Sequence, residues 1–357
     1  GVTLVAGTDY NTSTANTIAG LSALTANDVV EIVVYDVFSV FSGNINSDFS
    51  VGGNLTVTGT VDIDGAATTD GITNAGNFST DGGTIKLDGN YPTGTDNVAL
   101  GDTALDSVES GAQYNVAIGH AAGTALTTGD QNVAVGAFAL DAQTTASTNT
   151  ALGYAALSSN TDGVANVGVG LLALGANTTA VSNTAVGYAA LDATTTGGLN
   201  TAVGQDALGY QALGANTTGG NNVAVGYQAL DANTTGAANT AIGYTALGAN
   251  TEADGGVAIG NRALDANTTG DYNVGIGHDA LGANTTGTLN VAIGATALDA
   301  NTTANNNTAV GYAALGANTT GDRNVAVGTS SADAITTGSR NVAIGYNSMT
   351  ANTTGGR

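Results

Sequence analysis

Apolar and polar residues recur along most of the chain with a period of 17 residues. From Asn97 onward the pentapeptide Asn-[Thr/Val]-Ala-[Val/Ile/Leu]-Gly begins fifteen times, once with Gly256 in place of the Asn, and the spacing is 17 residues apart from one step of 18 and one of 22. The consensus of one repeat is NTAVGYxALDANTTGxx, and coil positions 1 to 17 are counted from its first Asn. A fixed period of this size is typical of solenoids, in which each repeat forms one coil. We therefore predict an all-β fold, a parallel β-solenoid or β-roll over residues 94–357, about 70 Å long.

The alternation within a repeat predicts how its side chains are arranged. Position 2 is always Val or Thr and position 4 always Val, Ile or Leu, which places both on one face of a strand. Position 5 is always Gly and position 3 is Ala except at Gly168 and Gly275, so the opposite face is expected to meet another backbone closely. Position 9 is Leu in 12 copies, and we predict that positions 4 and 9, such as Val186 and Leu191, fill the interior of the coil. A second strand is expected over Ala-Asn-Thr-Thr, with the Gly of position 15 closing the turn.

One coil contains only two or three sizeable apolar side chains, which is too few to stabilise a free thin roll. We therefore expect a homotrimeric fibre. Closing three rolls around an axis would bury the Ala/Gly face and explain why its side chains are small. The Val/Thr face is the alternative, and other closed oligomers or an end-to-end filament stay open.

Two columns of Asn are expected to stack from coil to coil, with their amides bonded along the axis. Gly256 at position 1 and Thr194 at position 12 should mark local breaks. The Asn-Thr-Thr sequences also match the glycosylation motif, but an internal ladder is the favoured interpretation. Ice binding is disfavoured because only one of two adjacent Thr side chains can face outward. The predicted structural ladder at position 1 includes Asn132, Asn149, Asn166, Asn183, Asn200, Asn222 and Asn239.

Two features interrupt the simple repeat. Five residues are duplicated after Asn200, at residues 204–213, and we expect a protruding loop there. Position 10 alternates between Gly and Asp over much of the array, as in Gly248, Asp265 and Gly282. The alternation separates like charges along the stack. Duplication of a 34-residue unit also explains it and is the favoured interpretation.

The first 93 residues differ from the repeats. Residues 1–43 are expected to form a small β region for attachment, with a strand from Val29 to Val40. Residues 44–93 contain short strand-and-turn segments that are typical of a thin shaft, and Pro92 marks a turn before the repeats.

Composition and charge exclude several classes of protein. The chain has no Cys, so a disulfide framework and a Cys-ligated metal site are both excluded. The net charge of −23 would repel the phosphates of nucleic acids. No apolar run is long enough for a membrane-spanning helix, so membrane insertion is not expected. With 54 Gly but only one Pro and no Gly-X-Y period, the sequence is not collagen-like.

No catalytic, cofactor or metal site is predicted. The only two histidines, His120 and His278, are nine coils apart at position 6, and the Asp residues are scattered on turns rather than paired in a cleft. Asp62 and Asp64 form an isolated Asp-x-Asp, which does not match a calcium loop. Position 6 also predicts a partly exposed column that packs against neighbouring coils or, as the alternative, stacks on sugar rings: Tyr154, Tyr188, Tyr227, Tyr244, Tyr312 and Tyr346.

The repeats resemble those of tail fibre proteins of marine and cyanobacterial bacteriophages, in which runs such as NTAVGYAAL followed by NTTG are common. LTANDVVEIVVYDVFSV at residues 24–40 is similar to an N-terminal segment in that group. The pentapeptides NVAIG and NVAVG resemble the head domains of trimeric autotransporter adhesins, which are left-handed parallel β-rolls, although the adhesin coil is usually shorter than 17 residues.

The resemblance implies a structural fibre of a virion tail, a rigid spacer with a role in host attachment. Its expected partners are copies of itself in a homotrimer, other tail proteins and a host cell-surface glycan. The alternative is a cellular surface adhesin or extracellular filament subunit, located on a bacterial surface. An enzyme is not expected, because a stack of near-identical coils offers no unique pocket.

Overall fold

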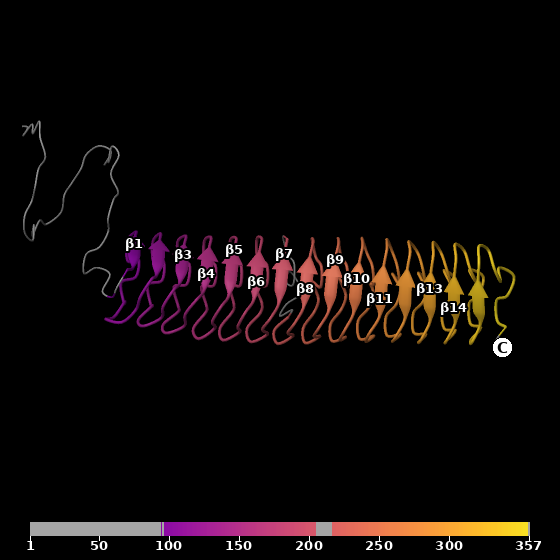
Figure 1. Ribbon diagram of the computed structural model, residues 1–357. Coiled ribbons are helices and arrows are strands. Elements are labelled where there is room, and N and C mark those ends of the chain that lie inside the picture. The colour runs from indigo at the N-terminus through magenta and orange to yellow at the C-terminus, as the bar shows by residue number, and fades with distance from the viewer. Residues whose placement is uncertain (1–93, 95, 205–215, 356–357) are drawn as a thin grey trace, which may run out of the picture. The chain divides into compact units, whose positions relative to one another are not determined.

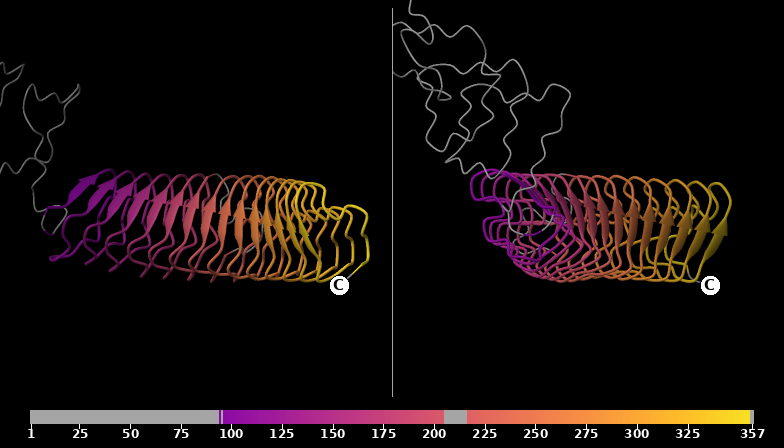
Figure 2. Two further views of the ribbon diagram at one scale, coloured as in Figure 1. Left: turned by 45° about the vertical axis from the view of Figure 1, so that its right-hand side comes forward. Right: turned by 60° about the vertical axis from the view of Figure 1, so that its left-hand side comes forward.

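The repeats form one β-solenoid, in which every repeat is a single coil. The computed structural model describes residues 94, 96–204 and 216–355. The 15 strands lie side by side in chain order in one parallel sheet (Figures 1 and 2). This confirms the predicted parallel solenoid with 17-residue coils. Their bounds are β1 Val98–Leu100, β2 Val116–Ile118, β3 Val133–Val135, β4 Thr150–Leu152, β5 Val167–Val169, β6 Thr184–Val186, β7 Thr201–Val203, β8 Val223–Val225, β9 Thr240–Ile242, β10 Val257–Ile259, β11 Val274–Ile276, β12 Val291–Ile293, β13 Thr308–Val310, β14 Val325–Val327 and β15 Val342–Ile344.

Predictions about the first 93 residues and about a loop within 204–213 fall outside the described residues, apart from Gly204. The register around the insertion is described, because β7 pairs with β8 as Thr201 with Val223 and Val203 with Val225. The coil after the insertion is therefore back in the common register. Among the described residues no helix exists that is long and apolar enough to cross a membrane.

Each strand covers only positions 2 to 4, and the rest of the coil is built of turns. The expected second strand over Ala-Asn-Thr-Thr is absent from the described coils, and that prediction was wrong. The chain turns before and after this segment, since in one coil Ala189, Leu191 and Leu199 have φ values of 51°, 56° and 61°. Such left-handed residues interrupt an extended chain. They recur at positions 7, 9 and 17 along the array, mostly without Gly.

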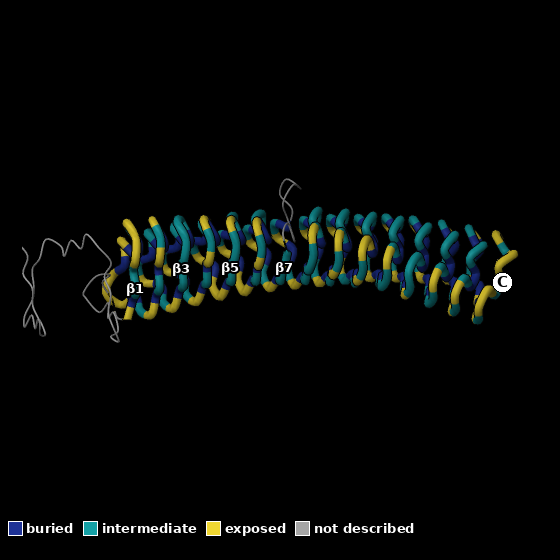
Figure 3. The backbone as a smooth tube through the Cα atoms, turned by 90° about the horizontal axis from the view of Figure 1, so that it is seen from above, coloured by how far each residue is buried: buried dark blue, intermediate teal, exposed yellow. Residues whose placement is uncertain are grey.

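The interior of each coil is lined by positions 1, 3, 8, 9 and 12. In one coil Asn183, Ala185, Ala190 and Leu191 are all 0% exposed. The predicted burial of position 9 is confirmed by Leu191. The predicted burial of position 4 is wrong, because the Val186 side chain is 38% exposed. The strand is turned the other way: the small residue points inward and the two larger β-branched residues point outward. In Figure 3 buried segments recur in coil after coil along the stack.

The narrow interior explains this orientation. A Cβ atom added to Gly168 at position 3 would lie 3.4 Å from Leu157 Cγ, and one added to Gly275 would lie 3.2 Å from Leu264 Cγ. The Leu of the preceding coil therefore leaves room for little more than a methyl group at position 3. A Val or Ile there would overlap the Leu, since cores at crystal-like density have no spare volume.

Position 5 is Gly because the next coil approaches it. A Cβ atom added to Gly153 would lie 2.3 Å from the carbonyl oxygen of Gly170, and Gly153 has a φ of 142°. The predicted close backbone contact is therefore confirmed, but it is made by the next coil of the same chain. The Ala/Gly face is occupied by contacts within one chain, so the expected closure of three chains around that face was wrong.

Two coils rearrange the interior in the same way. Gly123 replaces Leu at position 9 while Leu126 replaces Asn at position 12, and Ala332 and Ile335 do the same near the C-terminal end. Leu126 is 2% exposed and Ile335 is 0% exposed, so the apolar side chain enters the interior from the other position. Positions 9 and 12 therefore share one volume of the core.

Candidate interaction surfaces

The Asn residues of position 1 form a hydrogen-bonded ladder inside the solenoid. The backbone N–H of Asn183 donates to Oδ1 of Asn166 at 3.0 Å, and the backbone N–H of Asn200 donates to Oδ1 of Asn183 at 2.9 Å. The side-chain amide of Asn183 donates to the carbonyl oxygen of Gly197 in the same coil at 2.9 Å. One buried amide thus joins two coils and closes its own coil. The same backbone-to-side-chain bond links Asn132, Asn149, Asn166, Asn183, Asn200, Asn222 and Asn239 in series.

The ladder at position 1 is interrupted at Gly256. Its backbone N–H still donates to Oδ1 of Asn239 at 2.8 Å, but Gly256 has no side-chain oxygen to accept a hydrogen bond from the next coil. The side-chain amide of Asn273 keeps its bond to the carbonyl oxygen of Gly287 in its own coil, at 2.6 Å, and also donates to that of Gly270 in the preceding coil, at 3.0 Å.

A second ladder runs through position 12. The amide of Asn250 donates to Oδ1 of Asn233 at 2.8 Å. Thr194 breaks it locally: its hydroxyl accepts from the Asn216 amide at 3.3 Å, whereas the buried Oδ1 of Asn177 has no partner. Seven Asn residues of position 12 begin Asn-Thr-Thr sequences and are at most 1% exposed: Asn177, Asn216, Asn233, Asn267, Asn284, Asn301 and Asn318. A glycosylating enzyme cannot reach them in the folded coil.

The tyrosines of position 6 lie on the surface along one edge of the coils. Tyr227 and Tyr244 stack with ring centroids 5.6 Å apart and planes inclined by 13°. Nearer the N-terminal end of the array, the ring of Phe138 at position 7 makes edge contacts with the rings of His120 and Tyr154. The ring centroids are 5.3 and 5.7 Å apart. The position 6 tyrosines are between 42% and 77% exposed: Tyr154, Tyr188, Tyr227, Tyr244, Tyr312 and Tyr346. The structure therefore brings neighbouring members of this column into contact without burying them.

The outer face of the sheet is an uncharged, mainly apolar surface, and its position 4 side chains were predicted to lie inside the coil. Positions 2 and 4 of β1 to β15 contain only Val, Thr, Ile and Leu. The most exposed position 4 side chains of β1 to β14 are 37% to 47% exposed: Leu100, Ile118, Leu152, Val186, Val203, Ile242, Ile259, Ile293 and Val327. The sequence indicates such a surface through position 4, which is apolar in every repeat although its side chains do not fill the coil.

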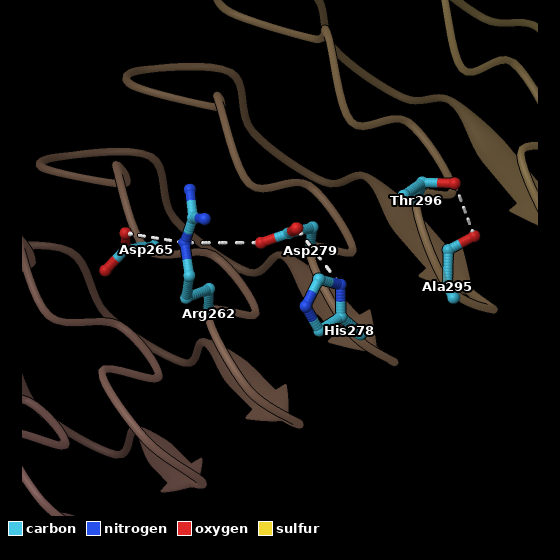
Figure 4. A network of polar contacts seen from close by, with 6 residues as sticks. All are labelled: Arg262, Asp265, His278, Asp279, Ala295 and Thr296. Atoms are coloured by element: carbon cyan, nitrogen blue, oxygen red, sulfur yellow. Dashed lines mark hydrogen bonds and ion pairs between the residues drawn. The ribbon is translucent and has the colours of Figure 1, made fainter.

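A charged cluster links two neighbouring coils (Figure 4). Arg262 Nε lies 3.6 Å from Asp265 Oδ2 in its own coil and 3.3 Å from Asp279 Oδ1 in the next. The Nδ1 atom of His278 lies 3.0 Å from Asp279 Oδ2. Arg262 therefore screens carboxylates that would otherwise repel each other along the edge.

Two carboxyl groups of position 10 have perturbed acidity. Burial raises the pKa of Asp299, the nearby Asp279 carboxylate raises it further, and Arg262 and His278 oppose the shift. Burial also raises the pKa of Asp141, against backbone hydrogen bonds that lower it. Both groups are therefore harder to ionise than an ordinary Asp.

Within the part of the chain that the structure describes, no group of three or more His, Asp or Glu side chains is placed to hold a metal ion. His120 and His278 are largely exposed, and each lies beside an Asp. Comparison with protein-family models, with curated proteins and with solved structures finds no match. Among the described residues, we take the tyrosine column and the outer face of the sheet as the candidate interaction surfaces.

Proposed function

We propose that this chain is a structural fibre protein of a phage tail, which acts as a rigid spacer and holds a host-recognition surface away from the virion. The observation that carries the proposal is the unbroken stack of coils, in which the described strands pair one after another from β1 to β15. Its interior is filled by its own side chains. Such a stack supplies length and stiffness, whereas its repeated coils supply no unique pocket for a substrate.

The acidic surface fits this role. The net charge of −23 keeps neighbouring fibres apart in solution. Because the chain has no Cys, its folding does not depend on an oxidising compartment, and assembly in a bacterial cytoplasm is feasible. In this proposal the fibre is a homotrimer, residues 1–93 join it to other tail proteins, and the chain is not an enzyme.

The assignment to a phage is tested by locating the protein. An antibody against the repeats should label the tails of purified virions in electron micrographs. Detection in the surface fraction of uninfected bacteria would contradict the proposal and favour a cellular adhesin or filament subunit.

Recognition of a host glycan is tested separately, with the tyrosine column. The stacked pair Tyr227 and Tyr244 offers aromatic faces on which sugar rings stack. A purified fibre should bind host cells and compete with infection, and Tyr227→Ser/Tyr244→Ser should weaken both effects. The control is Tyr272→Ser, because Tyr272 at position 17 is 59% exposed but lies outside the column. A full-length fibre that neither binds cells nor competes would leave only the spacer role.

A further inference from the structure

We infer that the outer face of the sheet, formed by positions 2 and 4 of β1 to β15, packs against the same face of further copies of this chain, parallel and coil to equivalent coil. The inference deepens the proposed fibre, on which it rests, by naming the surface that joins its chains. It replaces the Ala/Gly face, which the structure places inside one chain.

The first argument is the chemistry of this sheet face. Fifteen strands present only Val, Thr, Ile and Leu at positions 2 and 4, and none of these side chains is charged. Other exposed columns contain acids in at least one coil: Asp102 at position 6, Glu252 at position 14 and Asp254 at position 16. Chains with a net charge of −23 repel each other, so they associate most readily through a surface free of carboxylates.

The second argument is size. A sheet face about 70 Å long and about 10 Å wide offers roughly 700 Å² per chain. A standard stable protein interface buries about 800 Å² per partner. A monomer rarely exposes one contiguous apolar patch of this extent without a partner for it.

The third argument is the period. The outward side chains form ridges that recur once per coil, in the same register at every strand pair, as in Thr184 with Thr201 and Val186 with Val203. The ridges of two sheets stay in register along the full length only if both sheets have the same spacing. A second copy of this chain meets that condition, and its identical coils meet at equal heights in a closed parallel assembly.

The absence of native Cys makes cysteine cross-linking a direct test with the full chain. Val186→Cys places a thiol on the sheet face, and Thr196→Cys places one at exposed position 14 of the same coil. With a short thiol-specific cross-linker, Val186→Cys should yield covalently joined chains, whereas Thr196→Cys should not. Ile118→Cys and Val327→Cys, near opposite ends of the array, should each link to themselves, because antiparallel chains would link only when the two variants are mixed.

A charge on the sheet face provides the second measurement. Val186→Glu should shift the native mass by light scattering from oligomer to monomer, while far-UV circular dichroism stays unchanged. Thr196→Glu is the matched control and should leave the mass unchanged, since Glu252 occupies the same coil position naturally.

Several outcomes would overturn the inference about this face, and they differ in whether the fibre proposal survives. An oligomer that cross-links through Thr196→Cys but not Val186→Cys uses another face, and the fibre proposal survives. A monomer whose Val186→Cys thiol reacts freely with maleimide has an open face. A monomer whose Val186→Cys thiol is protected has a face covered by another part of its own chain, such as residues 1–93. Detection of the protein in virions is unaffected by any of these results.

Discussion

At the residue scale, the fold depends on places where only one kind of side chain fits. The Gly of position 5 combines a left-handed φ with contact to the next coil. A Cβ atom added to Gly170 would lie 2.2 Å from the carbonyl oxygen of Gly187, and Gly170 has a φ of 136°. Because the atom that it would meet is backbone, the clash can be relieved only by moving the next coil.

Replacement of this glycine should therefore be severely destabilising. Gly170→Ala is expected to cost at least about 3 kcal/mol, from backbone strain together with steric overlap. Hydrogen exchange of the amides in the coils that begin at Asn166 and Asn183 measures the local loss. Gly316→Ala is the control, since its Cβ would lie 3.2 Å from the Ala313 carbonyl oxygen and Asp occupies this coil position elsewhere. Equal exchange in the two variants would refute the close-contact explanation.

A second residue-scale prediction concerns the buried amides. Asn250→Ala removes the donor to Asn233 Oδ1 at 2.8 Å and leaves that buried oxygen unpaired. The expected cost is about 3 kcal/mol, again measured by hydrogen exchange in the flanking coils. Asn250→Thr also leaves Asn233 Oδ1 unpaired but should cost less than Asn250→Ala, because its hydroxyl can accept from the Asn267 amide as Thr194 accepts from Asn216. If Asn250→Ala is neutral, the ladder contributes nothing to stability.

The raised pKa of Asp299 gives a pH dependence with a definite sign. The folded state binds the proton more tightly than the unfolded state, so this group lowers stability as pH rises from the ordinary Asp pKa through the raised one. Asp299→Asn should therefore stabilise the protein near pH 7 and have little effect well below the ordinary pKa of about 4. Thermal unfolding at the two pH values measures the difference. A gain of equal size at both would contradict the electrostatic cause.

At the element scale, the unit of the structure is the coil, and each coil has one small interior. Leu at position 9 and Asn at position 12 are exchanged together for Gly123 and Leu126 in one coil and for Ala332 and Ile335 in another. Their shared volume predicts coupling between the two positions.

A double-mutant cycle on Leu281 and Asn284 tests this coupling. Leu281→Ala alone should cost about 2–5 kcal/mol through the cavity that it leaves. Asn284→Leu alone should also be destabilising, because it overfills the interior and breaks the bonds to Asn267 Oδ1 and the Gly287 carbonyl. The double variant should be more stable than the sum of the two costs implies, measured by hydrogen exchange in this coil. Additive costs would contradict the shared volume.

The alternation at position 10 has a local physical reason in two coil pairs. A Cβ atom added to Gly248 would lie 3.1 Å from Asp265 Oδ1, and one added to Gly282 would lie 3.0 Å from Asp299 Oδ1. The carboxylate therefore leans over the glycine of the preceding coil. This steric account was not foreseen from the sequence, which suggested duplication or charge spacing.

The sequence predicts the period and the contacts of the coil better than which side chains of the strand point into it. The period, the burial of Leu191 and the close contact at position 5 follow from the positions that vary little or not at all from repeat to repeat. The inward side of the strand does not follow, because Ala185 and Val186 are both apolar and only the width of the interior decides between them. The turn at Leu191 does not follow from the sequence either, because its left-handed φ is one that sequence patterns associate with Gly or Asn.

At the scale of the whole molecule, the proposed spacer has a length that is set by the number of coils. Backbone hydrogen bonds run from coil to coil along the stack, such as Thr184 N–H to the Asn200 carbonyl oxygen at 2.8 Å. Removal of whole coils should leave the remaining ladders intact, since each repeat contacts mainly its neighbours. Removal of part of a coil should break the register of both Asn ladders.

Rod length measured by electron microscopy of purified full-length protein tests this central claim most directly. The solenoid should measure about 70 Å, and deletion of two whole coils, residues 273–306, should shorten it by about 10 Å without loss of β-structure. Deletion of residues 273–298, which is not a whole number of coils, serves as the control and should disrupt the rod. Compact particles, or a length that does not change when two coils are removed, would contradict the account.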